Sequence, residues 1–137
     1  MTRHAQSGNA LIEFAVSLGL LAMLFMGIFE FGYSFYTYAA LQNAVRAGAR
    51  YAAMQAAADP AEVAKAVRNL VVYGDPAPAD RAKPLVSGLT TDRVELIDSP
   101  SARTVELRDF ELDAVFIKFR LDGRPTVTFP ITSGSAK

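Results

Sequence analysis

The chain has 137 residues, of which 51% are apolar, and its 14 basic residues balance 14 acidic ones. This length allows one modest domain and a membrane anchor. The balanced charge predicts no nucleic-acid partner. There is no cysteine and the single histidine is His4, which excludes disulfides and thiolate metal sites and argues against histidine-based catalysis.

The first third of the chain predicts a membrane-spanning helix behind a short polar leader. No charged residue occurs from Phe14 to Phe29, and the apolar stretch that begins at Leu11 reaches about 19 residues, enough to cross roughly 30 Å of hydrocarbon as a helix. A secretory signal would have a shorter apolar run with a cleavage site after it, whereas this run is followed by an aromatic group that suits a membrane interface. We therefore expect a leader at residues 1–8 and a retained transmembrane segment at about residues 11–32.

Helical patterning continues beyond the apolar run to about Ala58. There is no proline between Tyr38 and Ala58, and small residues recur four apart, at Ala40, Ala44, Gly48, Ala52 and Ala56. Such a stripe lets a neighbouring backbone approach closely, although alanine is also the best helix former and helix propensity explains the stripe equally well. We predict one helix over residues 9–58, roughly 70 Å long. Its candidate packing residues are Gly19, Ala40, Ala44, Gly48 and Ala52.

Residues 59–137 begin with a second, shorter helix. Asp59 is placed to cap it, Pro60 suits its first position, Glu62 suits its third, and Gly74 suits its end. Residues 75–84 contain three prolines and predict a loop.

The rest of the chain, after residue 84, predicts a small antiparallel sheet with one solvent-exposed face, because its apolar residues alternate with polar ones. The alternating residues are Val94 and Leu96; Val105 and Leu107; Ile117, Phe119 and Leu121; and Val127, Phe129 and Ile131. Asp122-Gly123 predicts a tight hairpin turn between the last two strands. The fold class is therefore α+β, with a long N-terminal membrane-spanning helix, a second short helix and a small sheet.

The predicted membrane helix and the residue before it carry a set of motifs. These are Gly8, Glu13-Phe14-Ala15, Gly27-Ile28-Phe29-Glu30-Phe31-Gly32 and Ala47-Gly48-Ala49-Arg50-Tyr51-Ala52-Ala53. Together they resemble the TadE-like family, pilin-like proteins of tight-adherence (Flp, type IVc) pilus systems. They cover about a third of the chain, and the rest is similar only in size and in the order of its elements. Many relatives carry a proline where this chain has Ser17-Leu18-Gly19, which leaves open whether the helix bends at Gly19.

The resemblance implies that a membrane aspartic prepilin peptidase cleaves after Gly8 and leaves Asn9 as the new N-terminus. Glycine offers no side chain to obstruct the peptidase. The new ammonium and Glu13 would lie one helical turn apart, and pairing them within or between subunits offsets part of the cost of charge at the membrane edge. Glu13 and Phe14 are therefore the expected subunit-assembly residues. Taken alone, Glu13 is better explained as an interfacial acid near a helix N-terminus; Gly8 and the later motifs reverse that preference.

Three further charges, Glu30, Arg46 and Arg50, are candidates for ion pairs. Glu30 lies about 25 Å along the helix from Glu13, near the expected outer interface, where exposure among headgroups explains it equally well. Arg50 could bind a neighbouring carboxylate, but a solvated charge explains it slightly better. No catalytic residue, metal site or cofactor is predicted, because the acids at 92, 95 and 98 fit an alternating strand and its exit.

The predicted function is that of a minor pilin or pseudopilin-like protein that helps to assemble a tight-adherence pilus; a major pilin of this type would be much shorter. Arg3 precedes the apolar run, which predicts an N-terminus in the bacterial cytoplasm, a single pass through the cytoplasmic membrane and a C-terminal domain outside. Expected partners are other pilins, the assembly platform, the prepilin peptidase and the membrane, without a small-molecule substrate. The rival hypothesis is an unprocessed single-pass envelope protein with a small extracytoplasmic binding domain. Both incorporation in the filament and retention at its base fit the sequence.

Overall fold

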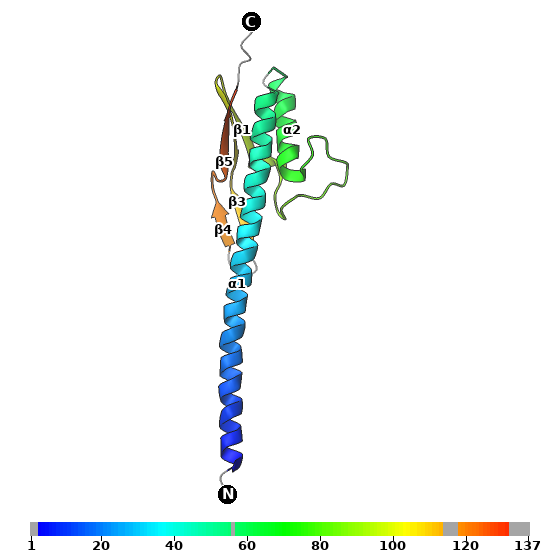
Figure 1. The fold of residues 1–137 in the computed structure, drawn as a ribbon. Coiled ribbons are helices and arrows are strands. Elements are labelled where there is room, and N and C mark those ends of the chain that lie inside the picture. Colours follow the sequence, from blue (N-terminus) through cyan, green and yellow to red (C-terminus); the bar gives the residue numbers. More distant parts are fainter. Residues whose placement is uncertain (1–2, 56, 114–117, 132–137) are drawn as a thin grey trace.

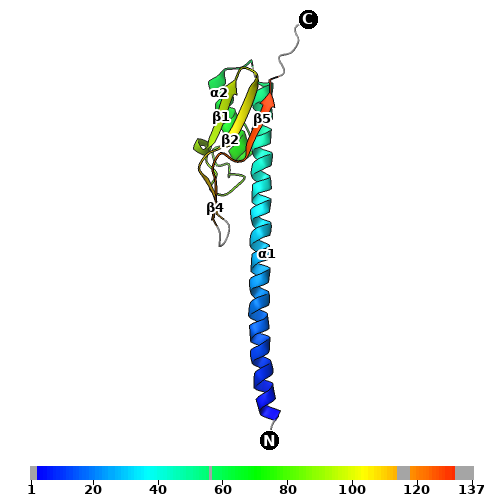
Figure 2. The same ribbon diagram turned by 90° about the vertical axis from the view of Figure 1, so that its left-hand side faces the viewer.

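The structure, a computed structural model, describes residues 3–55, 57–113 and 118–131. Its elements follow in the order α1 (Arg3–Met54), α2 (Pro60–Tyr73), a short 3-10 turn (Thr91–Arg93), β1 (Val94–Ser99), β2 (Ala102–Leu107), β3 (Phe110–Asp113), β4 (Lys118–Leu121) and β5 (Thr126–Pro130). α1 forms the long axis, and α2 and the strands lie beside its C-terminal half only (Figures 1 and 2). The predicted α+β fold, with a long helix, a short helix and a small antiparallel sheet, is confirmed.

α1 is 52 residues long, which corresponds to about 78 Å at the usual helical rise. It begins at Arg3 rather than at residue 9, because no proline separates the leader from the apolar run and Gly8 is tolerated within a helix. It ends at Met54 rather than at Ala58, since the next few residues reverse the chain into α2. Ala58 donates a backbone hydrogen bond to the Gln55 carbonyl within this reversal.

α2 begins and ends where its capping residues predict. The Asp59 carboxylate accepts a 2.9 Å hydrogen bond from the Ala61 amide. Gly74 adopts the left-handed conformation (φ +78°) and its amide donates to the Leu70 carbonyl, which closes the last turn. The buried side chains of α2 are those of four valines, Val63, Val67, Val71 and Val72.

The strands form two antiparallel units rather than one. β1, β2 and β5 make a three-stranded sheet in that order, and β3 pairs only with β4. The predicted hairpin between the last two strands is therefore wrong: β4 and β5 belong to different sheets, and Asp122-Gly123 turns the chain from one sheet to the other. Gly123 does adopt the positive φ expected of a turn glycine (+65°). Strand alternation predicts which side chains face inward but does not predict the pairing partner.

The hydrophobic core lies where α1, α2 and the three-stranded sheet meet. α1 contributes Leu41, Val45 and Ala49, which recur four apart and are fully buried. The sheet contributes Val105 and Leu107 of β2, which are also fully buried. This core fixes α2 and the strands, together called the outer domain after their expected position, to one half of α1 and leaves the other half uncovered.

Candidate functional site

The predicted processing junction lies within α1. Gly8 and Asn9 are helical and exposed, and a Cβ built on Gly8 would meet nothing within 4 Å. The junction is thus accessible from the side. Because a glycine weakens a helix and the nearby first turn lacks partners for its amides, local unwinding here requires little free energy.

Glu13 and Phe14 are exposed on the same uncovered part of α1. Asn9 and Glu13 are four residues apart, so their Cβ atoms lie about 5–6 Å apart on one face of the helix. Glu13 is the only charged residue between positions 8 and 29. The arrangement places the Glu13 carboxylate one helical turn from residue 9.

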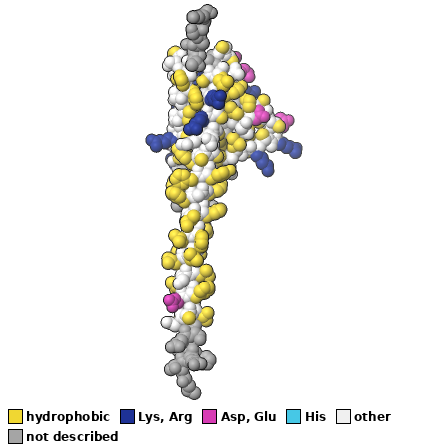
Figure 3. All heavy atoms as spheres, in the orientation of Figure 1, with side chains coloured by type: hydrophobic (Ala, Val, Ile, Leu, Met, Phe, Trp, Pro, Cys, Tyr) yellow, Lys and Arg dark blue, Asp and Glu magenta, His cyan; other side chains and the backbone are white. Residues whose placement is uncertain are grey.

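The N-terminal half of α1 presents apolar side chains on all sides. Every residue from Gly8 to Phe29 is exposed, and in Figure 3 apolar side chains predominate on the visible face of the helix above the grey end. In the described part of the chain this is the one helix long and apolar enough to cross a membrane. An apolar surface of this extent needs lipid or other helices around it.

The stripe of small residues packs within the chain. Ala44, Gly48 and Ala52 are buried, and a Cβ built on Gly48 would lie 2.6 Å from Cγ2 of Val71 in α2. The close helix approach that the stripe permits is thus used by α1 and α2. Ala40 is partly buried, and Gly19 has open space around it.

Of the three charges proposed for ion pairs, Glu30 lies far along α1 from Arg46 and Arg50, which are one helical turn apart. Glu30 is only 6% exposed, although Phe29 and Phe31 on either side of it are 65% and 66% exposed. Arg46 and Arg50 are exposed on the C-terminal half of α1, about 24 Å or more farther along the helix. Burial of Glu30 makes exposure among headgroups a poor explanation for that residue.

No cluster of three or more potential metal ligands occurs among the described residues. Among the groups that the structure describes, shifted pKa values occur at two exposed residues of the outer domain. A hydrogen bond from the Thr90 side chain is the main cause that lowers the pKa of Asp92, and a hydrogen bond to Glu106 is the main cause that raises the pKa of Arg108. Arg108 also forms ion pairs with Glu95 and Glu106. These shifts therefore reflect surface hydrogen bonding and ion pairing.

Two features were not anticipated from the sequence. The first is a buried arginine, Arg103, whose Nη1 lies 2.8 Å from Oδ2 of Asp98. The second is an apolar groove between α1 and the β3–β4 pair. The alternation of Phe119 and Leu121 with charged residues pointed to a buried strand face, but it gave no sign of a gap beside that face.

Comparison with known proteins supports the resemblance. The family model described as TadE-like protein matches residues 8–50. No significant match was found among curated proteins or among solved structures. The match associates the chain with tight-adherence pili. It begins at Gly8, ends at Arg50 and leaves residues 51–137 unmatched, which include α2 and all the strands.

Proposed function

We propose that the chain is a minor pilin or pseudopilin-like protein that is cleaved after Gly8 and helps to assemble a tight-adherence pilus. The observation that carries this proposal is the family match over residues 8–50, which starts at the proposed cleavage residue and includes Glu13. The role is one of interaction rather than catalysis. The proposed site is the cytoplasmic membrane, with the outer domain on the far side.

Cleavage would change the electrostatics of the helix start. It creates an ammonium on Asn9, and the same turn of helix carries Glu13. Each charge alone is unfavourable next to hydrocarbon, and pairing offsets part of that cost. Between subunits, the pair fixes the axial register, because Glu13 of one chain meets the ammonium of another.

The uncovered half of α1 supports this assembly role. Its exposed residues, among them Phe14, face whatever surrounds the chain. In the membrane that surrounding is lipid, and in an assembly it is the helices of other pilins. The small residues Ala44, Gly48 and Ala52 are already occupied by α2, so contacts between subunits fall chiefly on the part of α1 before them.

Glu13→Ala tests the mechanism, with Ser17→Ala as the matched control because Ser17 is an exposed polar residue one turn farther along α1. We expect both variants to be processed, since cleavage depends on Gly8. We expect pili to be lost or greatly reduced only in cells with Glu13→Ala, counted by electron microscopy. Normal piliation with Glu13→Ala would refute the register role.

A further inference from the structure

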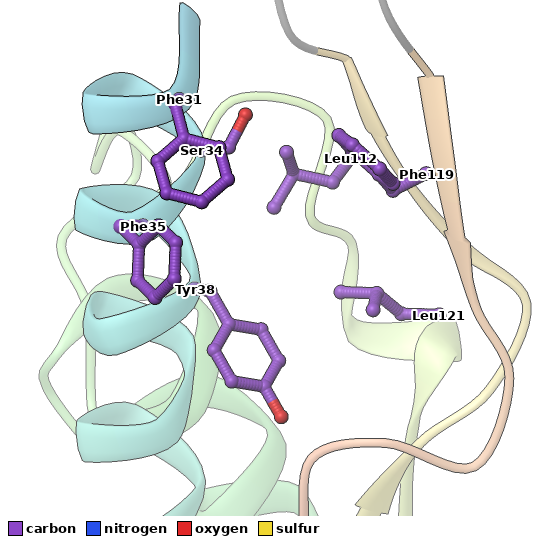
Figure 4. Close-up of a pocket in the computed structure, with 7 residues that line it drawn as sticks. All are labelled: Phe31, Ser34, Phe35, Tyr38, Leu112, Phe119 and Leu121. Atoms are coloured by element: carbon purple, nitrogen blue, oxygen red, sulfur yellow. The ribbon is translucent and has the colours of Figure 1, made fainter. Parts of the chain in front are cut away.

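An apolar groove separates α1 from the β3–β4 pair near the middle of α1. Figure 4 shows side chains from both sides facing one another across it: Phe31, Ser34, Phe35 and Tyr38 from α1, and Leu112, Phe119 and Leu121 from the strands. Its volume is about 330 Å³. This volume lies at the lower end of the range of small-molecule sites, about 300–1,000 Å³.

The lining of the groove favours hydrocarbon over a polar ligand. The Ser34 hydroxyl donates a 2.9 Å hydrogen bond to the Glu30 carbonyl of its own helix, so it is satisfied without water. The rings of Phe31 and Phe35 lie against each other, with centroids 4.7 Å apart. Across the gap, Phe119 is 46% exposed, which is a large apolar area for a residue that faces inward from a strand.

The groove lies at the level where the membrane is expected to end. In both views the β3–β4 pair is the part of the sheet layer nearest the N-terminal half of α1 (Figures 1 and 2). The expected transmembrane segment, residues 11–32, rises about 32 Å, close to the roughly 30 Å of a hydrocarbon core. Phe31 therefore lies at the outer end of the core, and Tyr38 lies about 10 Å beyond it. The exposed tyrosines Tyr33 and Tyr36 occupy the same level, as residues of an interfacial belt do.

We propose that this groove binds the upper part of an acyl chain of an outer-leaflet phospholipid, and that this contact docks the outer domain on the membrane surface. The proposal rests on the part of the proposed function that places α1 in a membrane. The α1 wall of the groove continues the exposed apolar surface of the helix past the buried Glu30, because Phe31 and Phe35 are exposed as Phe29 is. The same hydrocarbon that covers this surface can therefore cover the groove.

The charges near the groove favour a zwitterionic headgroup. Since Phe119 and Leu121 face α1, strand alternation places Arg120 on the opposite face of β4. There it stands directly across from Glu111 of β3 in the pairing register, and both residues are exposed. Asp113 and Lys118 form a second such pair in the same register, so the strand pair carries positive and negative charges in equal number, as a phosphate beside an ammonium does. No dependence on anionic lipid is expected.

The chain contains no tryptophan, so single substitutions create a unique fluorescent reporter. Full-length Phe119→Trp, Arg120→Trp and Phe25→Trp would each be reconstituted into phosphatidylcholine vesicles whose acyl chains carry bromine, a contact quencher, either near the headgroup or deeper. Phe119→Trp reports on the groove, and Arg120→Trp is the neighbour on the opposite strand face. Phe25→Trp reports on the span, where Phe25 is exposed.

We expect Phe119→Trp to lose most of its fluorescence, and more with bromine near the headgroup than with deep bromine. Phe25→Trp should be quenched more strongly by the deep bromine, and Arg120→Trp should keep most of its fluorescence. An unquenched Phe119→Trp beside a quenched Phe25→Trp would overturn the lipid assignment while leaving the anchor intact. Equal quenching at positions 119 and 120 would overturn it too, since the whole strand pair would then be immersed.

One other result is also decisive. If Phe25→Trp itself is not quenched, α1 is not in the membrane, and the proposed function fails together with this inference.

Discussion

Gly48→Ala probes the contact between α1 and α2 most directly. The new Cβ would lie 2.6 Å from Cγ2 of Val71 and 3.4 Å from Cγ1 of Val67, whereas carbon atoms normally touch at roughly 3.5–4.0 Å. Both valines are fully buried. Because valine is held to one rotamer in a helix, Val71 cannot swing aside, and the two helices must move apart by nearly an ångström.

Two opposing effects set the change in the free energy of unfolding caused by Gly48→Ala. Replacing glycine with alanine inside a helix stabilises it by about 1 kcal/mol. Overpacking a core costs about 1–3 kcal/mol, and the 2.6 Å approach to a fully buried, stiff side chain places Gly48→Ala in the upper part of that range. We expect a net loss of about 1 kcal/mol, which lowers the melting temperature of a domain of this size by roughly 4–8 °C.

The assay is thermal unfolding of the full chain in detergent micelles, followed by near-ultraviolet circular dichroism of the tyrosines. Tyr51 and Tyr73 pack against the core and report on its integrity. Gly32→Ala is the matched control, because nothing lies within 4 Å of a Cβ at that position; its melting temperature should stay the same or rise slightly. Adding Val71→Ala should cost less in the Gly48→Ala background than alone, since it removes the clashing methyl groups. A Gly48→Ala variant as stable as Gly32→Ala would refute the packing argument.

Two further predictions concern the outer domain and use the same thermal assay. Asp59→Ala removes the cap of α2 and should cost about 1 kcal/mol, whereas Asp59→Asn should be nearly neutral; equal losses in both variants would contradict the capping role. Asp98→Ala leaves the buried guanidinium of Arg103 without its carboxylate. Because Asp98 is itself 43% exposed, the free energy of unfolding should fall by only a fraction of the roughly 3–5 kcal/mol lost when a fully buried pair is broken. Arg103→Met leaves only a solvated carboxylate and keeps most of the apolar stem, so it should destabilise the domain less than Asp98→Ala does. A larger loss of stability in Arg103→Met would contradict this account.

Local chemistry allowed the helices to be predicted from the sequence. Asp59-Pro60 and Gly74 set the ends of α2 because capping depends on a few neighbouring residues. The membrane helix was equally predictable, since an unbroken apolar run has few alternatives. The start of α1 was predicted at residue 9, behind the leader. The helix instead starts at Arg3, because the leader contains no proline to stop it.

Features that depend on distant partners were harder to predict. The alternation at Phe119, Leu121, Val127 and Phe129 identified strand residues, but a period of two fits either neighbour, and the true pairing joins β5 to β2. The small residues around Gly48 indicated a close helix contact without indicating whether the partner was α2 or another subunit. The groove beside Phe119 was unpredictable for a related reason: it depends on a gap between two elements that are far apart in the sequence.

The central claim, cleavage after Gly8, is tested most directly by mass spectrometry of the mature N-terminus in cells with and without the prepilin peptidase. We expect a chain that starts at Asn9 when the peptidase is present and a chain that keeps residues 1–8 when it is absent. An intact leader in both strains, or a mature chain that starts elsewhere, would contradict the pilin account and favour an unprocessed single-pass envelope protein.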